Sequence, residues 1–462
     1  MGDASQITGA NTELIEWTLL SYMGRINYDF KEKYLLTATL RVDGSSRFGT
    51  NTKYGYFPSV ALGWNISEEP FLKSVKAIDQ LKLRLSYGAV GNQGINPYQT
   101  QALLGRTAYS WDNTPAYGYR PATIGNPDLR WETSTTQNAG LDFSLFNGRI
   151  AGSVEYYITN TTDLLAPQPL PTSRGFGGYI TNIGETQNKG IELTIGSVNV
   201  DSKGFKWTTD FIFNRNREAI IELANGKVDD IASGRFIGQP LTVFFDYKKA
   251  GIWQSNEADL AAKFGDKVGQ VRIEDSNLDG KINADDRQIL GSAVPDFTLG
   301  ITNRFTFKGF DLSFFVFGRF GQMIRSRFHT DQNTLAGRYN NLNIDYWTPN
   351  NPTNEFPQPV VTQEFPKFNS SLQYFNGSFI KIRNINIGYN VPESFASKLK
   401  MDGLRIFASI QQPFIFSEYI TKYKGMDPET FVDGEQGVGG GDINANVSPA
   451  ARIITFGLNI KF

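Results

Sequence analysis

Polar and apolar residues alternate along most of this chain with a period of two, as expected for strands whose two faces meet different surroundings. In segment 33–44, for example, Leu36 and Leu40 share one face, whereas Thr37 and Arg41 share the other. Comparable segments recur throughout the sequence and predict about thirteen strands. They lie near 17–30, 33–44, 55–66, 80–91, 130–146, 149–162, 188–200, 204–217, 297–307, 310–320, 377–391, 403–414 and 452–462.

Tight turns join several of these segments in pairs. Asn147 and Gly148 stand between two alternating runs, and Asn-Gly favours a two-residue hairpin because both residues tolerate positive φ. Lys308 and Gly309 occupy the same kind of position between two later runs. The phase of the alternation slips near Arg383, which predicts a β-bulge at that residue.

The connections between the predicted strands fall into a short and a long set, which largely alternate along the chain. The short set comprises 31–32, 67–79, 147–148, 201–203, 308–309 and 392–402. The long set comprises 92–129, 163–187, 218–296, 321–376 and 415–451, with 45–54 intermediate in length. This sorting predicts an all-β fold, a transmembrane antiparallel β-barrel in the lipid bilayer of an outer membrane, with its long loops outside the cell. A tandem of β-sandwiches would also alternate, but it would not sort its loops by length.

Composition narrows the possible functions. The 462 residues include no Cys and one His, and the net charge of the chain is −1. Disulfides and Cys-based zinc sites are therefore excluded, and no basic field points to a nucleic-acid partner. No uncharged apolar run reaches the ~18 residues of a transmembrane helix, and no signal peptide is visible at the N-terminus. The single histidine, His329, is expected to be a loop residue with no special role.

The chain ends in RIITFGLNIKF, an alternating strand that finishes on Phe462. A terminal aromatic on such a strand resembles the signal that outer-membrane barrels present to their assembly machinery. If thirteen antiparallel strands end here, the first and the last run in the same direction and cannot close a barrel together. We therefore expect residues 1–16 to lead in from further strands upstream, with the barrel occupying 17–462.

Residues 275–286, DSNLDGKINADD, have the spacing of an EF-hand calcium loop. The loop lies in the predicted extracellular connection 218–296, so we expect Ca²⁺ to hold this long connection closed. An Asx-rich turn without metal is the alternative. Asp at the last position departs from the bidentate Glu that EF-hands prefer. The candidate ligands are Asp275, Asn277, Asp279, the carbonyl of Lys281, Asn283 and Asp286, with Gly280 at the sharp turn.

The predicted extracellular connection 321–376 is rich in aromatic residues beside Asn and Asp. Exposed aromatics in such a setting stack on sugar rings while the polar neighbours bind hydroxyl groups. Tyr339, Tyr346 and Trp347 are therefore candidate contacts for a substrate or a partner. The alternative is that these side chains pack the connection on itself or against a partner protein.

Several segments together resemble one known family. They are YLLTATLRVDGSSRFG, GYFPSVALGWNISEEPFL, LKLRLSYGAVGNQGI, NPDLRWETSTTQNAGLDFSLFNGRI, NKGIELTI, DSNLDGKINADDRQILGSAVPDFTLGITNRFTFKGFDLS, DYWTPNNPTNEFPQP, FIKIRNINIGYNVP and GMDPE. In this order and spacing, they resemble the C-terminal part of SusC-like, TonB-dependent outer-membrane transporters of Bacteroidota. The resemblance extends from about residue 17 to 462.

This resemblance implies a 22-stranded barrel, of which the chain would supply about the last thirteen strands. It also implies uptake of oligosaccharides, or in some members peptides, together with a SusD-like surface lipoprotein. TonB would act through an N-terminal part, with a plug domain, that lies outside this chain.

Two other function classes remain to be weighed. A glycan-degrading enzyme would need a pair of carboxylates, but Glu68–Glu69 and Asp229–Asp230 lie in connections without a partner that the sequence can place, so no enzymatic activity is predicted. A calcium-stabilised cell-surface protein for carbohydrate binding or adhesion, built from β-sandwiches, is the alternative to the importer. Solubility without detergent would favour it.

Overall fold

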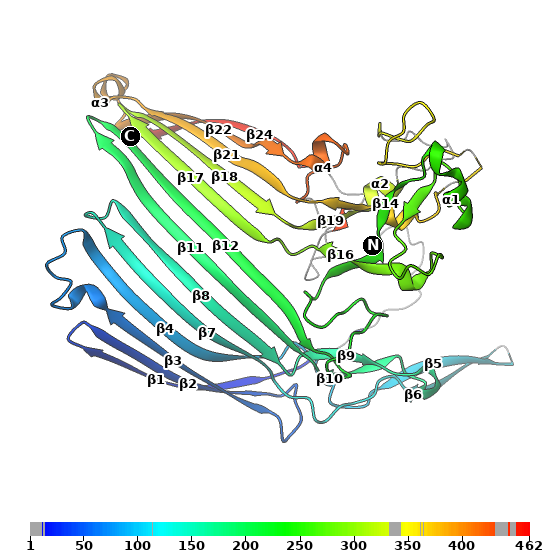
Figure 1. Ribbon diagram of the computed structural model, residues 1–462. Helices are drawn as coiled ribbons and strands as arrows, with labels where there is room; N and C mark the ends of the chain where they lie inside the picture. The colour runs from blue at the N-terminus through cyan, green and yellow to red at the C-terminus, as the bar shows by residue number, and fades with distance from the viewer. Residues whose placement is uncertain are drawn as a thin grey trace.

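A single curved antiparallel sheet dominates the computed structural model (Figure 1). The structure describes residues 12, 14–112, 114–331, 343–360, 362–363, 365–429, 442–443 and 450–462. Within them, the large sheet has thirteen strands, in an order that follows the chain. These are β1 (Leu19–Phe30), β2 (Tyr34–Ser45), β3 (Tyr54–Asn65), β4 (Ile78–Asn92), β7 (Glu132–Leu145), β8 (Ile150–Thr162), β11 (Glu185–Ser202), β12 (Phe205–Glu222), β17 (Phe297–Phe307), β18 (Phe310–Phe320), β21 (Phe379–Asn390), β22 (Gly403–Phe416) and β24 (Ile453–Lys461).

Each strand of the large sheet corresponds to one of the strands predicted from the alternation. The predicted bulge is present as well, because the pairing of β21 with both neighbours shifts by one residue between Ile382 and Asn384. The bulge leaves Arg383 without a partner position and reverses the phase of the side chains along the strand.

Neighbouring strands are antiparallel throughout the large sheet, and β1 and β24 form its two edges. Because thirteen strands alternate in direction, these two edge strands run the same way, as the sequence predicted. Figure 1 shows β1 at the bottom and β24 at the top of the curved sheet.

The two ends of the sheet differ in the length of their connections. One end, here called the turn end, carries only short connections, namely 31–33, 66–77, 146–149, 203–204, 308–309 and 391–402. The opposite loop end carries 46–53, 93–131, 163–184, 223–296, 321–378 and 417–452. The predicted sorting of loop lengths is therefore confirmed, except that 46–53 is a short connection at the loop end.

The two faces of the sheet differ in polarity. One, the apolar face, exposes large hydrophobic side chains such as Ile26, Leu85 and Phe456. The polar face carries ion pairs between strands, including Arg84 with Asp142 at 2.7 Å. An exposed apolar face is costly in water and favourable in lipid, whereas a polar face suits the lumen of a barrel.

Short elements build additional structure at the loop end. The small sheets pair β5 (Leu104–Trp111) with β6 (Thr114–Pro121), β9 (Leu165–Pro169) with β10 (Gly178–Asn182), β13 (Val243–Tyr247) with β16 (Arg287–Ser292), β14 (Lys249–Ile252) with β15 (Val271–Ile273), and β19 (Met323–Ser326) with β20 (Tyr374–Asn376) and β23 (Asp442–Ile443).

The helical segments are short. They are η1 (Ile66–Glu68), η2 (Thr172–Arg174), η3 (Ser255–Glu257), α1 (Ala258–Lys263), η4 (Ala284–Asp286), α2 (Arg327–Asp331), η5 (Asn369–Leu372), α3 (Glu393–Ala396), η6 (Ser397–Leu399) and α4 (Glu418–Thr421). None of the helices in the described part of the chain has the length and hydrophobicity needed to cross a membrane.

The main hydrophobic core of the described residues lies at the loop end rather than in the large sheet. Three long connections contribute to it, and the described parts of 223–296, 321–378 and 417–452 that pack on it are called the loop domain below. The core residues are Ile252, Val271, Ile273, Ile324, Trp347, Phe356, Leu372, Phe375, Tyr419 and Ile443.

Candidate functional site

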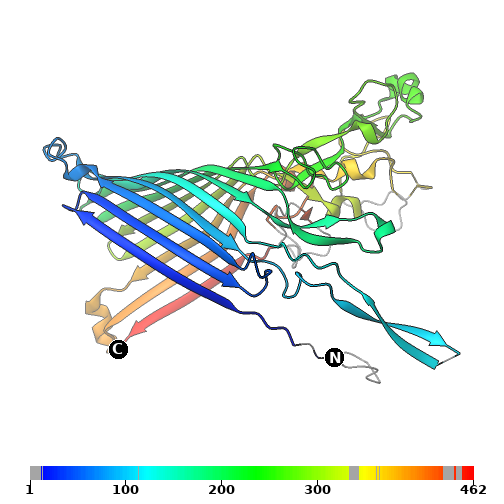
Figure 2. The ribbon, with the colours of Figure 1, turned by 90° about the horizontal axis from the view of Figure 1, so that it is seen from below.

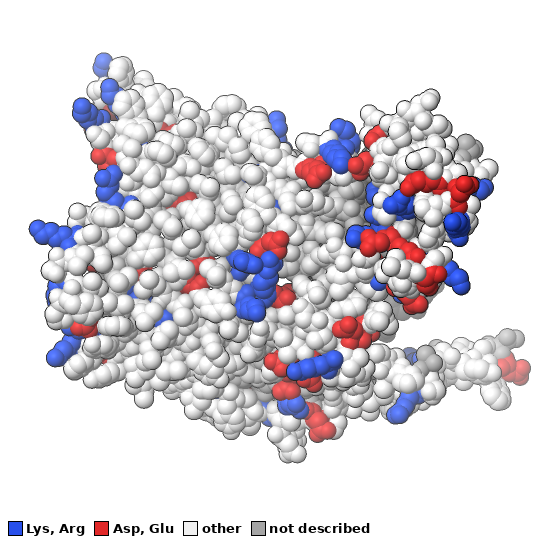
Figure 3. All heavy atoms as spheres, in the orientation of Figure 1, with Lys and Arg blue, Asp and Glu red and all other residues white. Residues whose placement is uncertain are grey.

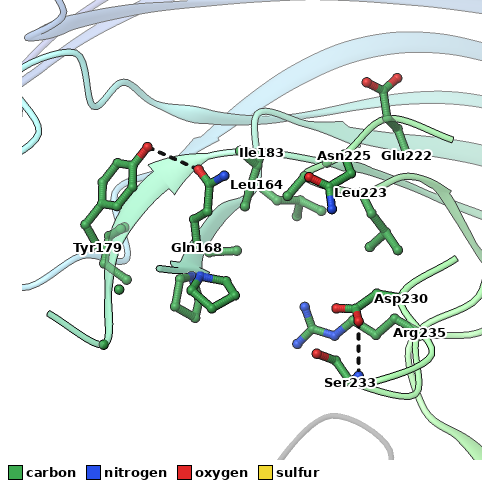
Figure 4. Close-up of a pocket in the computed structure, with 18 of the residues that line it drawn as sticks. Leu164, Gln168, Tyr179, Ile183, Glu222, Leu223, Asn225, Asp230, Ser233 and Arg235 are labelled. Atoms are coloured by element: carbon green, nitrogen blue, oxygen red, sulfur yellow. Dashed lines mark hydrogen bonds between the residues drawn. The ribbon is translucent and has the colours of Figure 1, made fainter. Parts of the chain in front are cut away.

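A cavity of about 630 Å³ opens at the loop end of the large sheet (Figure 4). Its walls come from three connections that are distant in sequence, 93–131, 163–184 and 223–296, together with the adjoining ends of β11 and β12. The cavity is large enough for a small molecule or for a few residues of an oligomer. We therefore treat it as a candidate binding site.

The first wall of the cavity is the β9–β10 hairpin. Its strands pair in register from Leu165 opposite Asn182 to Pro169 opposite Gly178. The Asn182 side chain fixes the base of the hairpin by donating to the backbone oxygens of Arg130 and Asp163, at 2.8 and 2.9 Å. The hairpin is therefore anchored to the neighbouring connection and can present its side chains in fixed positions.

The opposite wall is the segment that follows β12. Asp230 and Arg235 exchange two backbone hydrogen bonds of 2.8 and 2.9 Å, which close a tight loop between them. Gly234 within this loop has φ +64°, a left-handed conformation that glycine adopts without strain. In Figure 4 the Arg235 side chain extends into the space between this loop and the hairpin that carries Gln168.

The lining of the cavity combines apolar and charged groups. Leu164, Ile183 and Leu223 supply apolar surface. The charged lining residues are Glu222, Asp230 and Arg235. A ligand with apolar side groups and both hydrogen-bond donors and acceptors would complement this lining. The sequence analysis considered Asp230 only as half of a carboxylate pair and did not identify the others, because it assigned no structure to the connections that contain them.

The calcium-type loop folds around its own backbone N–H groups. Asp275 accepts hydrogen bonds from the N–H groups of Asp279 and Gly280, at 3.2 and 2.9 Å. Asn277 also accepts from Asp279, and Asp279 accepts from Lys281 at 2.8 Å. Gly280 has φ +79°, as the sharp turn of this motif requires.

The last part of the loop is tied to its beginning. Asp286 is fully buried and accepts from the N–H groups of Ser276 and Asn283, at 3.0 and 2.8 Å. Ile282 packs against the core of the loop domain. No three Asp, Glu or His side chains of the described residues are grouped so that they could hold a metal ion. The loop thus has the turns of the motif, and calcium binding stays a prediction.

The predicted aromatic contacts have different surroundings. Tyr346 is 45% exposed at the surface of the loop domain. Trp347 is only 2% exposed, and its indole N–H donates to Gln254 at 2.9 Å. Trp347 is therefore a core residue and not an exposed contact, which agrees with the alternative that these side chains pack the connection on itself. Tyr339 lies outside the described residues.

His329 is buried, contrary to the expectation of an ordinary loop residue. Its Nδ1 lies 2.8 Å from Ser326 Oγ, which is itself 2.6 Å from the Tyr419 hydroxyl. Its Nε2 lies 2.8 Å from the Tyr423 carbonyl oxygen. Burial lowers the pKa of His329 and raises that of Tyr419 to about 12, so both side chains are neutral at pH 7. The group joins two connections of the loop domain.

Of the paired carboxylates at residues 68 and 69, Glu69 is held in a network of hydrogen bonds. Glu69 accepts hydrogen bonds from Tyr34 at 2.7 Å, Lys33 at 3.0 Å and Trp64 at 3.2 Å. These bonds, the one from Tyr34 above all, lower the pKa of Glu69 to about 2. A carboxylate held ionised in this way stabilises the turn end and is a poor proton donor.

Phe462 is 83% exposed at the end of the chain, next to the turn end (Figure 1). Its position directly after β24 leaves the ring free for another surface, as an assembly signal would require.

Comparison with known proteins identifies the fold. Residues 16–411 match the family described as TonB dependent receptor-like, beta-barrel. The chain belongs to this family. Members are outer-membrane proteins, so the apolar face of the sheet is the lipid-facing surface of such a barrel, and the turn and loop ends are its periplasmic and extracellular ends.

Curated relatives carry receptor names. TonB-dependent receptor P3 of Formosa agariphila is 35% identical over 97% of this chain and 46% of its own length. TonB-dependent receptor SusC of Bacteroides thetaiotaomicron is 33% identical over 96% of this chain and 44% of its own length. The chain thus spans about half the length of the curated relatives it matches. These relatives are named as receptors, not as enzymes.

A solved structure agrees with this assignment. The structure of the RagAB peptide transporter superposes with a TM-score of 0.79 and 26% identity, over 99% of this chain and 50% of that one. The SusC-type resemblance predicted from the sequence segments is therefore confirmed.

Proposed function

We propose that this chain forms the C-terminal barrel portion of an outer-membrane nutrient importer that works with a SusD-like surface lipoprotein and takes up peptides or oligosaccharides. The observation that carries the proposal is the cavity at the loop end of a TonB-dependent receptor barrel. A ligand held there would lie at the extracellular end of the barrel, beside the lumen that the polar face of the sheet lines. TonB would drive its passage through a part of the transporter outside this chain.

The lining of the cavity favours short peptides over oligosaccharides. Leu164, Ile183 and Leu223 offer apolar surface for side chains, and Asp230 and Arg235 can pair with an amino and a carboxylate group. Sugar sites depend on flat aromatic faces, and Tyr179 is the one aromatic residue among the described side chains that line the cavity.

A surface lipoprotein would find a projecting contact in the β5–β6 hairpin. Tyr109, Trp111, Tyr117 and Tyr119 are 60–74% exposed on this hairpin, which extends away from the large sheet (Figure 2). An isolated two-stranded hairpin is marginally stable in water, so a protein that covers its aromatic side chains would stabilise it. We propose that the lipoprotein partner binds here.

The proposal is tested by uptake in cells that carry the whole transporter. We expect Arg235→Ala to reduce peptide uptake at least tenfold while leaving the amount of transporter in the outer membrane unchanged. Lys227→Ala is the matched control, because Lys227 is exposed in the same connection but does not line the cavity.

Two outcomes would change the proposal. A loss of oligosaccharide uptake with peptide uptake intact would assign the cavity to sugars. Wild-type uptake of both classes in the Arg235→Ala strain would remove the cavity from the transport path.

A further inference from the structure

A groove of about 510 Å³ lies at the turn end, on the apolar face of the sheet. It forms where the chain leaves β21 and folds into the short helical segments α3 and η6. Its lining is almost entirely apolar, and two of its side chains, Phe395 and Leu399, are 60% and 59% exposed. The lining residues are Tyr389, Val391, Pro392, Phe395, Lys398 and Leu399.

The groove continues the lipid-facing surface of the barrel. Strand register places a row of large side chains directly opposite one another across neighbouring strands, at the turn end of the apolar face. Phe310 and Tyr389 in this row have ring centroids only 4.3 Å apart. Outer-membrane barrels carry such aromatic girdles where the hydrocarbon meets the headgroups. The row consists of Phe205, Phe307, Phe310, Tyr389, Ile406 and Leu458.

Lys398 lines the groove and Lys308 lies in the neighbouring turn, and neither has a carboxylate partner among the described residues. Lys398 Nζ lies 5.4 Å from the centre of the Phe395 ring, and Lys308 Nζ lies 5.2 Å from that of Phe307. The turn that carries Lys308 reaches the groove, because the Asn390 N–H donates to the Gly309 carbonyl at 2.8 Å.

Three lysines and two carboxylates lie in the two turns beside the groove, so the positive charge is in excess by one. Lys400 is the second lysine of connection 391–402, beside Lys398, and Glu393 and Asp402 are the acidic residues of this connection. Figure 3 shows Lys and Arg gathered along the turn end of the molecule. A groove with an apolar floor and a cationic rim at a membrane surface matches a lipid with a negatively charged headgroup.

We propose that this groove binds an anionic glycerophospholipid of the periplasmic leaflet. One acyl chain lies against Tyr389, Phe395 and Leu399, and Lys308 and Lys398 hold the phosphate. Bound in this way, the lipid covers apolar surface that would otherwise meet water at the edge of the membrane. The inference rests on the outer-membrane placement of the barrel and is independent of what the transporter imports.

The test uses the whole protein, extracted from outer membranes in a mild detergent. Native mass spectrometry measures retention of dioleoyl phosphatidylglycerol against dioleoyl phosphatidylcholine, two probes with the same acyl chains. We expect the wild type to retain phosphatidylglycerol at least fivefold better. Lys308→Gln with Lys398→Gln should abolish this preference, whereas Lys227→Gln, at the loop end, should preserve it.

A second variant tests the apolar floor. Phe395→Ser with Leu399→Ser should reduce retention of both lipids, and heat-modifiable migration on gels confirms that the barrel is folded. Equal retention of the two lipids by the wild type, or an unchanged preference in the double lysine variant, would overturn the proposal. Peptide uptake by the double lysine variant reports separately on the import function, and we expect it to be unchanged.

Discussion

The Lys381 ammonium lies 2.6 Å from the Asp427 carboxylate, and this contact ties the connection after α4 to the wall of the barrel. The same ammonium lies 2.9 Å from Glu429, which also pairs with Arg383 at the β-bulge. Lys381 is only 4% exposed. The loop domain is thus attached to β21 by a buried ionic contact at the point where the strand changes phase.

Loss of this contact should loosen the attachment. Removing one member of a buried pair leaves an uncompensated charge, so Lys381→Met should cost about 3–5 kcal/mol. Lys206→Met is the control, since the pair of Lys206 with Asp201 is exposed and should contribute less than about 1 kcal/mol. Urea-dependent proteolysis of residues 417–429 measures the loosening, and we expect Lys206→Met to leave its midpoint unchanged. Equal midpoints for the two variants would contradict the prediction.

Acid should weaken the loop domain through His329. Its pKa is lowered in the folded state by burial, so the unfolded chain binds the proton more readily. The stability contributed by neutral His329 is therefore complete above the ordinary value of 6.5 and declines as pH falls below it. Hydrogen exchange of segments 323–331 and 417–425 should accelerate between pH 7.5 and 5.5. In His329→Gln this acceleration should be absent, and its persistence would assign the effect to other groups.

Calcium should bind the 275–286 loop if the predicted ligands act together. Isothermal calorimetry on the whole protein should show one site with micromolar to millimolar affinity, and Asp275→Asn with Asp279→Asn should abolish it. Asp285→Asn is the matched control, because Asp285 lies in the same loop but is not a predicted ligand. No heat at millimolar calcium would leave an Asx-rich turn as the explanation of the motif.

Phe462→Asp should impair assembly into the outer membrane. A charged residue replaces an exposed terminal aromatic, so the assembly machinery should recognise the last strand poorly. The amount of heat-modifiable protein in outer-membrane fractions should fall several-fold. Phe146→Asp, at another exposed position of the turn end, should have a smaller effect. Similar losses in the two variants would point to general destabilisation.

The large sheet could be predicted from the sequence almost strand for strand. Lipid on one face and a polar lumen on the other impose an alternation that tertiary packing does not override. The bulge at Arg383 was visible for the same reason, because an inserted residue changes which side chains are odd and which are even. The lengths of the connections then predicted which ends of the strands lie together.

The structure of the long connections was not predictable in this way. The β9–β10 hairpin depends on contacts between residues far apart, such as Asn182 with Arg130, which no local pattern reveals. Burial of Trp347 and His329 likewise depends on three connections meeting in one core. The polar neighbours of these aromatic residues in the sequence indicated exposure. Their packing partners come from other connections, which the sequence pattern does not show.

The hydrophobic core of the loop domain has a consequence for how the molecule unfolds. The loop domain is stabilised by the exclusion of water from its core, whereas the strands of the large sheet are stabilised by contact with lipid. A single denaturant should therefore not unfold both at the same concentration. Moderate urea should unfold the loop domain while the embedded strands persist. For the same reason the loop domain can change in sequence on its own. Substitutions there need only preserve its own hydrophobic core, and they leave the embedded strands unchanged.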